Sequence, residues 1–566
     1  MLNLIPTPKS LTIQEGFLPK NVILPRAQGL DPRLALALTA LPTAEDGIPL
    51  TVAVTGTEGE SYELSVTAEA VTITAPGPAG AFWGIQTLRQ LLTHDRIPCL
   101  TIEDAPEFAY RGFYHDVTRG KVPTVDTLKK LIDEMAYYKL NSLQLYVEHV
   151  YEFEECKDLI GSTGYFSAEE IRELDRYCAD RFVEFVPSLS TFGHLFELLN
   201  QPQYRHLQVL KDYKDIPNFW NARMGHHTID PLEPESIRLI SSLIDQYEPL
   251  FTSDTFNICC DETFDLKNHP RKDIDTGKMY VDFVKQIIAH TKSKGKKVMM
   301  WADILLQHPE VITDLPEDTV FLNWTYGPNP NEDWFSKFAE LNRTQIVCPG
   351  TSTWSRFCEN VEIEEQNICK LAAFGKKYNA MGMLNTNWGD WGNPCSLELA
   401  MYGMVLGAQQ SWTPGAPVDD AFYSAVNVLL YDHPQAIALL KTLSQMHSHI
   451  SWNRFARNYF ALRFEGVTPE NIITPEQLAQ VQALYNQVRE QLQAPWLRDE
   501  YRQEMLLAAE GICILAELAA KLAGQNPDRI TDPACWLRQY REKWVAKNKE
   551  SELRNIEEMF NWCESH

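Results

Sequence analysis

Residues 255–268 read TFNICCDETFDLKN, and the first half of this stretch has the character of a buried strand. A short, mostly apolar run bounded by polar residues is typical of a β-strand that is covered on both faces. The run ends at two adjacent acids, Asp261 and Glu262. Side-by-side carboxylates in that place are either a solvent-facing turn or part of a site built at the end of the strand, and the neighbouring segments decide between the two.

Seven other segments resemble this strand, and helical patterns such as residues 124–139 and 167–181 separate most of them. The expected strands are RGFYHDVT (111–118), NSLQLYVEH (141–149), FVEFVPSLS (182–190), TFNICCDE (255–262), KKVMMWAD (296–303), TVFLNWTYG (319–327), TQIVCPGTST (344–353) and AMGMLNTNWG (380–389). Eight strands that alternate with helices are the pattern of a (β/α)8 TIM barrel, a fold of the α/β class. The sequence therefore predicts a barrel over residues 109–415.

The regions on either side of the barrel have different patterns. Residues 1–108 contain alternating segments at 51–56, 61–67 and 70–76, a helical pattern at 80–93 and a last strand near 97–108, which predicts a small α/β domain. After residue 415 strand patterns stop, and 475–493 and 500–523 are long amphipathic helices. Residues 416–566 are expected to form an α-helical domain that either packs on the barrel or offers a surface for a homodimer.

Composition excludes several classes of function. The net charge of −25 disfavours nucleic acid and anionic membranes as partners. No apolar run approaches the roughly 18 residues of a membrane span, and the first residues lack the pattern of a signal peptide. Twelve cysteines occur without a CxxC pair, so we expect reduced thiols and a cytoplasmic location.

Metal and organic cofactors are not expected. Cys259 and Cys260 are neighbours on a strand, where successive side chains point to opposite faces and chelate poorly. His226 and His227 in GHHTIDP (225–231) have no third ligand nearby, which favours a loop.

The expected strands end in aromatic and acidic residues, and catalytic residues of such barrels lie at these C-terminal ends. Five of the fourteen tryptophans fall at the ends of the last four strands. Aromatic walls with a few charged groups suit a sugar, which has apolar ring faces and a rim of hydroxyls. No P-loop, GxGxxG, GxSxG or HExxH motif is present, so a glycosidase is the leading class.

The paired acids restrict the mechanism. A standard retaining glycosidase has two carboxyl groups about 5–5.5 Å apart on opposite sides of the bond, whereas consecutive Cα atoms are about 3.8 Å apart. If Glu262 is the acid, the nucleophile is a carboxylate on another strand or a group of the substrate. A 2-acetamido oxygen would serve, and Asp261 would then stabilise the acetamido nitrogen. We expect burial to raise the pKa of Glu262.

The sequence resembles glycoside hydrolase family 20, the β-N-acetylhexosaminidases, over roughly residues 1–430. The segments that carry the resemblance are YRGFYHDVTRGKVP (110–123), VPSLSTFGH (186–194), FNICCDETFDL (256–266) and LNTNWGDWG (384–392). The resemblance implies exo-acting removal of terminal GlcNAc or GalNAc by substrate-assisted retention through an oxazolinium intermediate, without a cofactor. The chain is most similar to a divergent, intracellular bacterial-type branch.

The resemblance also implies roles for individual residues. Glu262 would be the general acid/base and Asp261 would orient the acetamido group, with His194 supporting the acid. The substrate-binding residues would be Arg111 and Asp390 at the sugar hydroxyls, Tyr326 at the acetamido oxygen, and Trp301, Trp354 and Trp388 around the acetamido pocket.

The chain departs from the family pattern in two places. Cys259 and Cys260 replace a Gly-Gly pair, and LYVEH (145–149) replaces an HxTDD-like segment, so that Glu148 or His149 would take over its aspartate's role. Two alternatives stay open: a two-carboxylate glycosidase with Asp390, Glu148 or Asp303 as nucleophile, and a sugar-binding barrel without catalysis.

Overall fold

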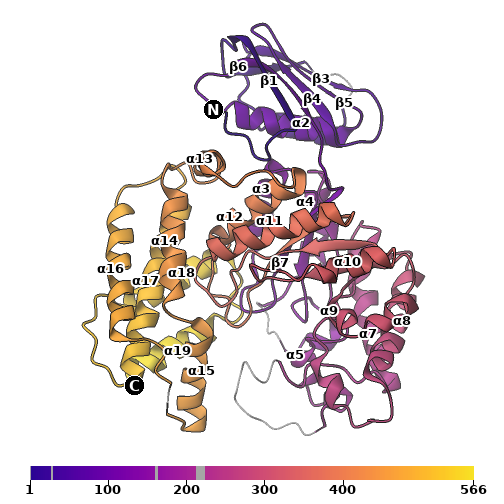
Figure 1. Cartoon of the computed structure of the whole chain (residues 1–566), viewed down its shortest axis with the longest axis vertical. Helices are drawn as coiled ribbons and strands as arrows, with labels where there is room; N and C mark the ends of the chain where they lie inside the picture. The colour runs from indigo at the N-terminus through magenta and orange to yellow at the C-terminus, as the bar shows by residue number, and fades with distance from the viewer. Residues whose placement is uncertain (1, 27–29, 160–163, 212–223, 469) are drawn as a thin grey trace.

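The computed structural model describes residues 2–26, 30–159, 164–211, 224–468 and 470–566. Figure 1 shows a small sheet domain at the N-terminal end, a barrel of strands and helices in the middle, and a group of C-terminal helices beside the barrel. Among the described residues no helix is both long and apolar enough to cross a bilayer.

The N-terminal region is a six-stranded sheet with helices on one face (Figure 1). In the order of the sheet its strands are β1 (Ser10–Phe17), β6 (Pro98–Asp104), β4 (Tyr62–Val66), β5 (Val71–Ala75), β3 (Ile48–Val54) and β2 (Ile23–Pro25). Its helices are α1 (Pro32–Leu38) and α2 (Pro78–Leu91). The edge strand β1 was not predicted from the sequence. Leu11 and Ile13 alternate with polar residues in it, but all of its residues are exposed, and its pairing with β6 defines it as a strand.

Eight parallel strands form the predicted barrel, so the α/β TIM-barrel fold class is confirmed. They are β7 (Tyr110–Asp116), β8 (Ser142–Tyr146), β9 (Glu184–Val186), β10 (Thr255–Asn257), β11 (Lys297–Trp301), β12 (Val320–Trp324), β13 (Gln345–Cys348) and β14 (Gly382–Asn387). β14 pairs with β7, and β9 meets β10 through hydrogen bonds from Asn257 N to Pro187 O (2.8 Å) and from Leu189 N to Asn257 O (3.1 Å). All eight strands predicted from sequence are present.

Helices surround the barrel and cover the strands. They are α3 (Val125–Tyr137), α4 (Ala168–Ala179), α5 (Phe196–Leu199), α7 (Pro234–Tyr247), α8 (Thr276–Ser293), α9 (Asp303–Gln307), α10 (Asp333–Glu340), α11 (Val361–Lys377) and α12 (Met401–Trp412). α4 begins with a capping box in which the Ser167 side chain accepts from the Glu170 backbone and the Glu170 side chain accepts from Ser167.

The C-terminal helices pack directly on the barrel, one of the two arrangements expected from sequence. They are α13 (Asp420–Leu429), α14 (Ala436–Ser448), α15 (Trp452–Phe460), α16 (Pro475–Gln491), α17 (Asp499–Leu522), α18 (Pro533–Lys547) and α19 (Leu553–Ser565). Lys547 of α18 pairs with Glu398 of the barrel region at 2.6 Å, and the indole of Trp452 donates to the carbonyl of Trp391 at 3.1 Å. The loop that follows β14 is thereby fixed by the helical region.

Gly382 allows β14 to pair closely with β7. A Cβ at this position would lie 1.9 Å from the carbonyl oxygen of Tyr110, the residue that pairs with it. We expect Gly382→Ala to lower the free energy of unfolding by about 1–3 kcal/mol, because the strands must separate to admit the methyl group. Urea unfolding followed by tryptophan fluorescence measures this. Gly327→Ala is the matched control, since nothing lies within 4 Å of its Cβ; equal midpoints for the two variants would contradict the expectation.

Candidate active site

A pocket opens at the C-terminal ends of the barrel strands, where sequence analysis placed the site. Its lining residues are Arg119, His194, Met224, Asp261, Glu262, Trp301, Trp324, Tyr326, Trp354, Trp388 and Asp390. The structure thus brings together the acid pair, His194, Asp390 and all four predicted aromatic residues. Arg111 and Glu148 do not line the pocket, and Arg119, Met224 and Trp324 are lining residues that had no assigned role.

The chain after β10 has an unusual backbone. Cys259, Cys260 and Glu262 have φ values of 55°, 67° and 50°, in the left-handed region that non-glycine residues rarely adopt. Each such residue costs on the order of 1–3 kcal/mol and persists only where surrounding contacts hold it. Here the Trp301 N–H donates to Cys259 O (3.0 Å) and the Tyr280 hydroxyl donates to Cys260 O (2.8 Å).

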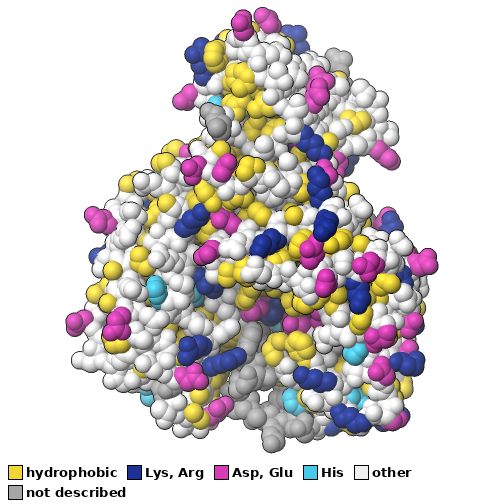
Figure 2. Space-filling model, in the orientation of Figure 1, with side chains coloured by type: hydrophobic (Ala, Val, Ile, Leu, Met, Phe, Trp, Pro, Cys, Tyr) yellow, Lys and Arg dark blue, Asp and Glu magenta, His cyan; other side chains and the backbone are white. Residues whose placement is uncertain are grey.

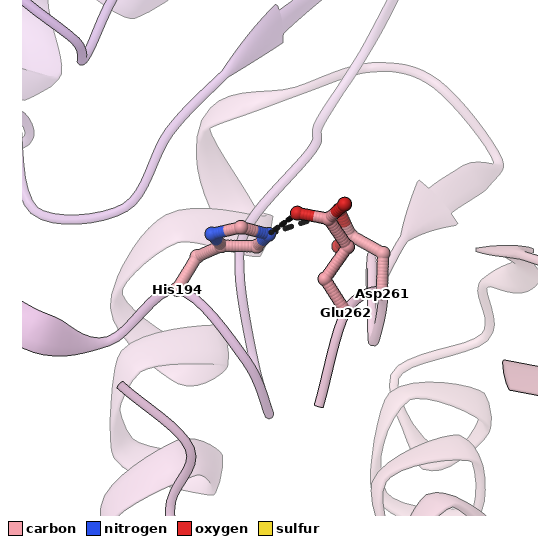
Figure 3. Close-up of side chains that lie close together, drawn as sticks. All are labelled: His194, Asp261 and Glu262. Atoms are coloured by element: carbon pink, nitrogen blue, oxygen red, sulfur yellow. Dashed lines mark ion pairs between the residues drawn. The ribbon is translucent and has the colours of Figure 1, made fainter. Parts of the chain in front are cut away.

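This backbone brings both carboxylates to one histidine. On an extended strand the side chains of consecutive residues point to opposite faces. In this protein Asp261 Oδ2 and Glu262 Oε2 each lie 3.3 Å from His194 Nε2, and Figure 3 shows the imidazole edge facing both carboxylates. The two acids therefore act on the same small region of the pocket.

The charge of His194 lowers the pKa of Glu262. Burial would lower the pKa of His194, but the adjacent Asp261 and Glu262 carboxylates raise it well above its ordinary value. Burial likewise raises the pKa of Glu262, yet the hydrogen bond and charge of His194, with help from Arg119, bring that pKa below its usual value. The predicted rise in the pKa of Glu262 was therefore wrong, because the imidazolium of His194 outweighs the effect of burial.

His194 is itself fixed by a neighbouring histidine. Its backbone N–H donates to Nδ1 of His227 at 2.8 Å, and the His227 backbone N–H donates to Asp265 at 3.0 Å. Sequence analysis treated the adjacent histidines at 226 and 227 as a plain loop, and only the fold shows that this loop supports His194.

Aromatic rings wall the pocket. The Trp388 indole donates to the Tyr326 hydroxyl at 2.6 Å, and the Tyr326 ring lies 5.1 Å from that of Trp354. Trp301 and Trp388 are also in contact, with ring centroids 5.9 Å apart. These large apolar surfaces suit the face of a sugar or a small apolar substituent.

Arg119, rather than Arg111, is the arginine of the pocket. Arg119 Nε pairs with Asp116 at 2.8 Å, and Nη1 pairs with Asp390 at 3.1 Å. Arg111 is the second residue of β7, so its side chain lies at the opposite end of the barrel, where it is fully buried and pairs with Glu60 at 2.7 Å. The prediction for Arg111 was wrong because the first residues of a barrel strand lie at the end opposite to the one that carries the catalytic residues. In the sequence Arg119 follows the same strand directly, and this position indicates the catalytic end of the barrel.

Glu148 lies beside the pocket, not in its lining. It is 7% exposed, accepts a hydrogen bond from the Tyr146 hydroxyl at 2.7 Å, and lies 3.7 Å from His149 Nδ1. Burial would raise the pKa of Glu148, but the nearby His149, His194 and Arg119 lower it to about 2. Direct substrate binding by Glu148 is therefore not supported by its position.

One group of side chains has the spacing of a metal site. The ligand atoms of His194, Asp261 and Glu262 lie within 4.8 Å of one another. Hydrogen bonding between the imidazolium and the two carboxylates accounts for this cluster. Cys259 and Cys260 do not join it, because their sulfurs contact Ser188 at 3.4 Å and Thr191 at 3.3 Å. That the protein needs no metal stays a prediction.

Comparison with known proteins places the chain in a family of (β/α)8 glycosidases. Residues 108–413 match the family described as "Glycosyl hydrolase family 20, catalytic domain", and residues 1–105 match its "domain 2". The chain belongs to glycosyl hydrolase family 20.

Curated relatives are similar at the level of sequence. A beta-hexosaminidase of Porphyromonas gingivalis is 26% identical over 55% of this chain and 41% of its own length. A beta-hexosaminidase of Vibrio furnissii is 25% identical over 54% of each chain. The matches span 41%, 45% and 34% of the first three curated relatives, less than half of their lengths.

Solved structures share the fold. A chitobiase from Flavobacterium johnsoniae covers 99% of both chains with a TM-score of 0.62 and 18% identity. A Vibrio harveyi exo-β-N-acetylglucosaminidase, solved with N-acetylglucosamine, covers 75% of this chain and 76% of its own, with a TM-score of 0.59 and 18% identity.

We expect different defects from replacing Arg111, in the first barrel strand, and Arg119, in the loop after it. Arg111→Met leaves Glu60 without its buried partner, so we expect the free energy of unfolding to fall by about 3 kcal/mol with kcat/KM unchanged. Arg119→Met removes charged hydrogen bonds from the pocket, so we expect kcat/KM to fall roughly 100-fold, equivalent to about 2.7 kcal/mol. Steady-state kinetics on an aryl glycoside and urea unfolding measure both quantities. A large kinetic defect in Arg111→Met alone would reverse the assignment.

Proposed function

We propose that this protein is an exo-acting β-N-acetylhexosaminidase that removes terminal GlcNAc or GalNAc from the non-reducing end of a small glycan. The observation that carries the proposal is the pair Asp261–Glu262 facing His194 inside an aromatic-walled pocket. Family membership supports hydrolysis of glycosides, and the names of the curated relatives support an N-acetylhexosamine as the sugar.

The positions of the two carboxylates support a substrate-assisted mechanism. Asp261 and Glu262 share one histidine, so we expect them to approach a bound sugar from one side, which argues against their acting as the opposed acid and nucleophile of a two-carboxylate enzyme. The 2-acetamido oxygen of the substrate would attack the anomeric carbon while Glu262 protonates the leaving oxygen. Asp261 would accept a hydrogen bond from the acetamido nitrogen and stabilise its developing positive charge in the oxazolinium.

The other carboxylates near the pocket are less suited to act as nucleophile. Asp303 accepts a hydrogen bond from the Glu262 backbone, and Glu148 lies outside the lining. Asp390 does line the pocket, but it pairs with Arg119. We propose that Arg119 and Asp390 together bind the sugar hydroxyls at the end of the pocket away from the reacting bond. Of the three carboxylates, Asp390 is the one that would act as nucleophile if the mechanism were a conventional two-carboxylate one.

The proton of the general acid has a defined source. The lowered pKa of Glu262 favours its ionised form at neutral pH, and the raised pKa of His194 favours the imidazolium, whose Nε2 lies 3.3 Å from Glu262 Oε2. His194 and Glu262 therefore share one proton, and its pKa is a property of the pair. When bound substrate excludes water and the shared proton is on Glu262, Glu262 can donate that proton to the glycosidic oxygen.

We also propose a cytoplasmic location and leave the oligomeric state to experiment. All twelve cysteines are free thiols, ten of them buried, as suits a reducing compartment. Light scattering on the purified protein distinguishes a monomer from the homodimer that the helical region would allow.

The proposed nucleophile is tested with paired aryl β-glycosides, one with a 2-acetamido and one with a 2-hydroxyl group. We expect turnover of the acetamido glycoside alone, and we expect Asp261→Asn and Glu262→Gln each to lower kcat by roughly 100- to 10,000-fold. With a dinitrophenyl leaving group, which needs no protonation, Glu262→Gln should recover much of its rate and Asp261→Asn should not. Equal cleavage of the 2-hydroxyl glycoside would assign the nucleophile to the protein; absence of turnover of either glycoside would favour a binding barrel.

The shared proton predicts a pH profile. His194 has a raised pKa, so the proton is retained until the pH exceeds the ordinary histidine value of about 6.5. We expect the basic limb of kcat/KM to lie above pH 6.5, and to move to lower pH in His194→Asn, where Glu262 loses its proton donor. Profiles of kcat/KM between pH 4 and 10 measure both. A basic limb near pH 4.5 in the wild type would contradict the shared proton.

A further inference from the structure

Asp303 lies directly behind the acid pair without lining the pocket. It is the first residue of α9, two residues after Trp301, and its Oδ2 accepts a hydrogen bond from the backbone N–H of Glu262 at 3.0 Å. The contact joins the end of β11 to the chain that follows β10. The carboxyl group therefore touches the main chain of the general acid and has no place among the residues that would meet substrate.

The hydrogen bond falls on a residue that needs support. Glu262 has a φ of 50°, so its backbone is in a conformation that a glutamate does not adopt without surrounding contacts. Cys259 and Cys260, the other left-handed residues of this turn, are held through their carbonyl groups by Trp301 and Tyr280. Glu262 is held through its N–H, and Asp303 supplies the acceptor.

We propose that Asp303 is a positioning residue that fixes the left-handed backbone of Glu262 and so directs its carboxyl group to His194 and the scissile bond. This inference rests on the proposed function, because it assigns Asp303 to the support of a general acid. It also separates Asp303 from the nucleophile role that sequence analysis left open for it.

The ionisation of Asp303 agrees with this role. Burial and the charge of Asp261 raise the pKa of Asp303 well above its ordinary value, which favours the neutral carboxyl group. A neutral acceptor adds no negative charge beside Asp261 and Glu262. Asparagine offers an amide oxygen of the same reach with no charge, and it should replace Asp303 with little loss.

Two variants separate the hydrogen bond from the packing. Asp303→Asn keeps an acceptor, whereas Asp303→Leu keeps a similar branched shape and removes it. We expect the asparagine variant to keep kcat within 3-fold of the wild type. We expect the leucine variant to lose at least 30-fold in kcat with KM within 3-fold, because the pocket still binds sugar while the acid is misplaced.

Asp175→Leu is the matched control. Asp175 is a buried aspartate that accepts from the backbone N–H of Thr252 at 3.1 Å, at the other end of β10. Its loss should lower the melting temperature and leave kcat unchanged. If Asp175→Leu lowers kcat as much as Asp303→Leu, the effect is general destabilisation and the proposal is overturned.

Hydrogen–deuterium exchange supplies a readout that does not need activity. The Glu262 amide should exchange at least 10-fold faster in Asp303→Leu than in the wild type, and at the wild-type rate in Asp303→Asn. Unchanged exchange in the leucine variant, or a 30-fold loss of kcat in the asparagine variant, overturns the proposal. If Asp303→Leu does not fold, the asparagine variant alone decides by the same limits. If the wild type hydrolyses neither glycoside, the proposed function fails while amide exchange still tests the positioning of Glu262.

Discussion

The contact between His194 Nε2 and the carboxylates of Asp261 and Glu262 is the interaction on which the chemistry of this pocket depends. It requires two consecutive acids on one side of the chain, which an extended strand does not give. The left-handed backbone after β10 provides that geometry, at a cost of the order of 1–3 kcal/mol for each left-handed residue. The barrel carries this cost because Trp301 at the end of β11, Tyr280 of α8 and Asp303 of α9 hold the turn by hydrogen bonds.

The remaining parts of the molecule support the barrel from outside, at both of its ends. The N-terminal sheet contributes Glu60, which pairs with Arg111 at the opposite end of β7. The C-terminal helices contact the loop after β14 that carries Asp390, through the hydrogen bond from Trp452 to the Trp391 carbonyl. Figure 2 shows acidic and basic side chains interspersed over the face in view, so the net charge of −25 is not gathered into one acidic patch there. The charged groups with an evident chemical role are those inside the pocket.

Much of the fold and part of the site were predictable from the sequence. The barrel strands were found because each is a short apolar run between helices, and the acid pair and tryptophans were found because they end such runs. β1 was missed because its alternation is limited to Leu11 and Ile13, and its place in the sheet depends on pairing with β6, which lies far along the chain. Arg111 was misassigned because its role was taken from the family resemblance, although its place at the start of the expected strand 111–118 puts it at the end of the barrel opposite the site. The pKa of Glu262 was predicted in the wrong direction because the distance to His194 depends on a contact between residues 68 positions apart.

The sequence by itself determined the order of strands and helices, the family, and which acids, histidine and tryptophans are available to the site. These follow from local periodicity and from motifs, which depend on neighbouring residues alone. Only the tertiary structure decided that Arg119 faces Asp390, that His227 fixes His194, and that Asp303 holds the backbone of Glu262. Each of these is a contact between segments that are separated in the sequence, and the packing of the strand ends and their loops in the barrel, not local sequence, brings them to within hydrogen-bond distance.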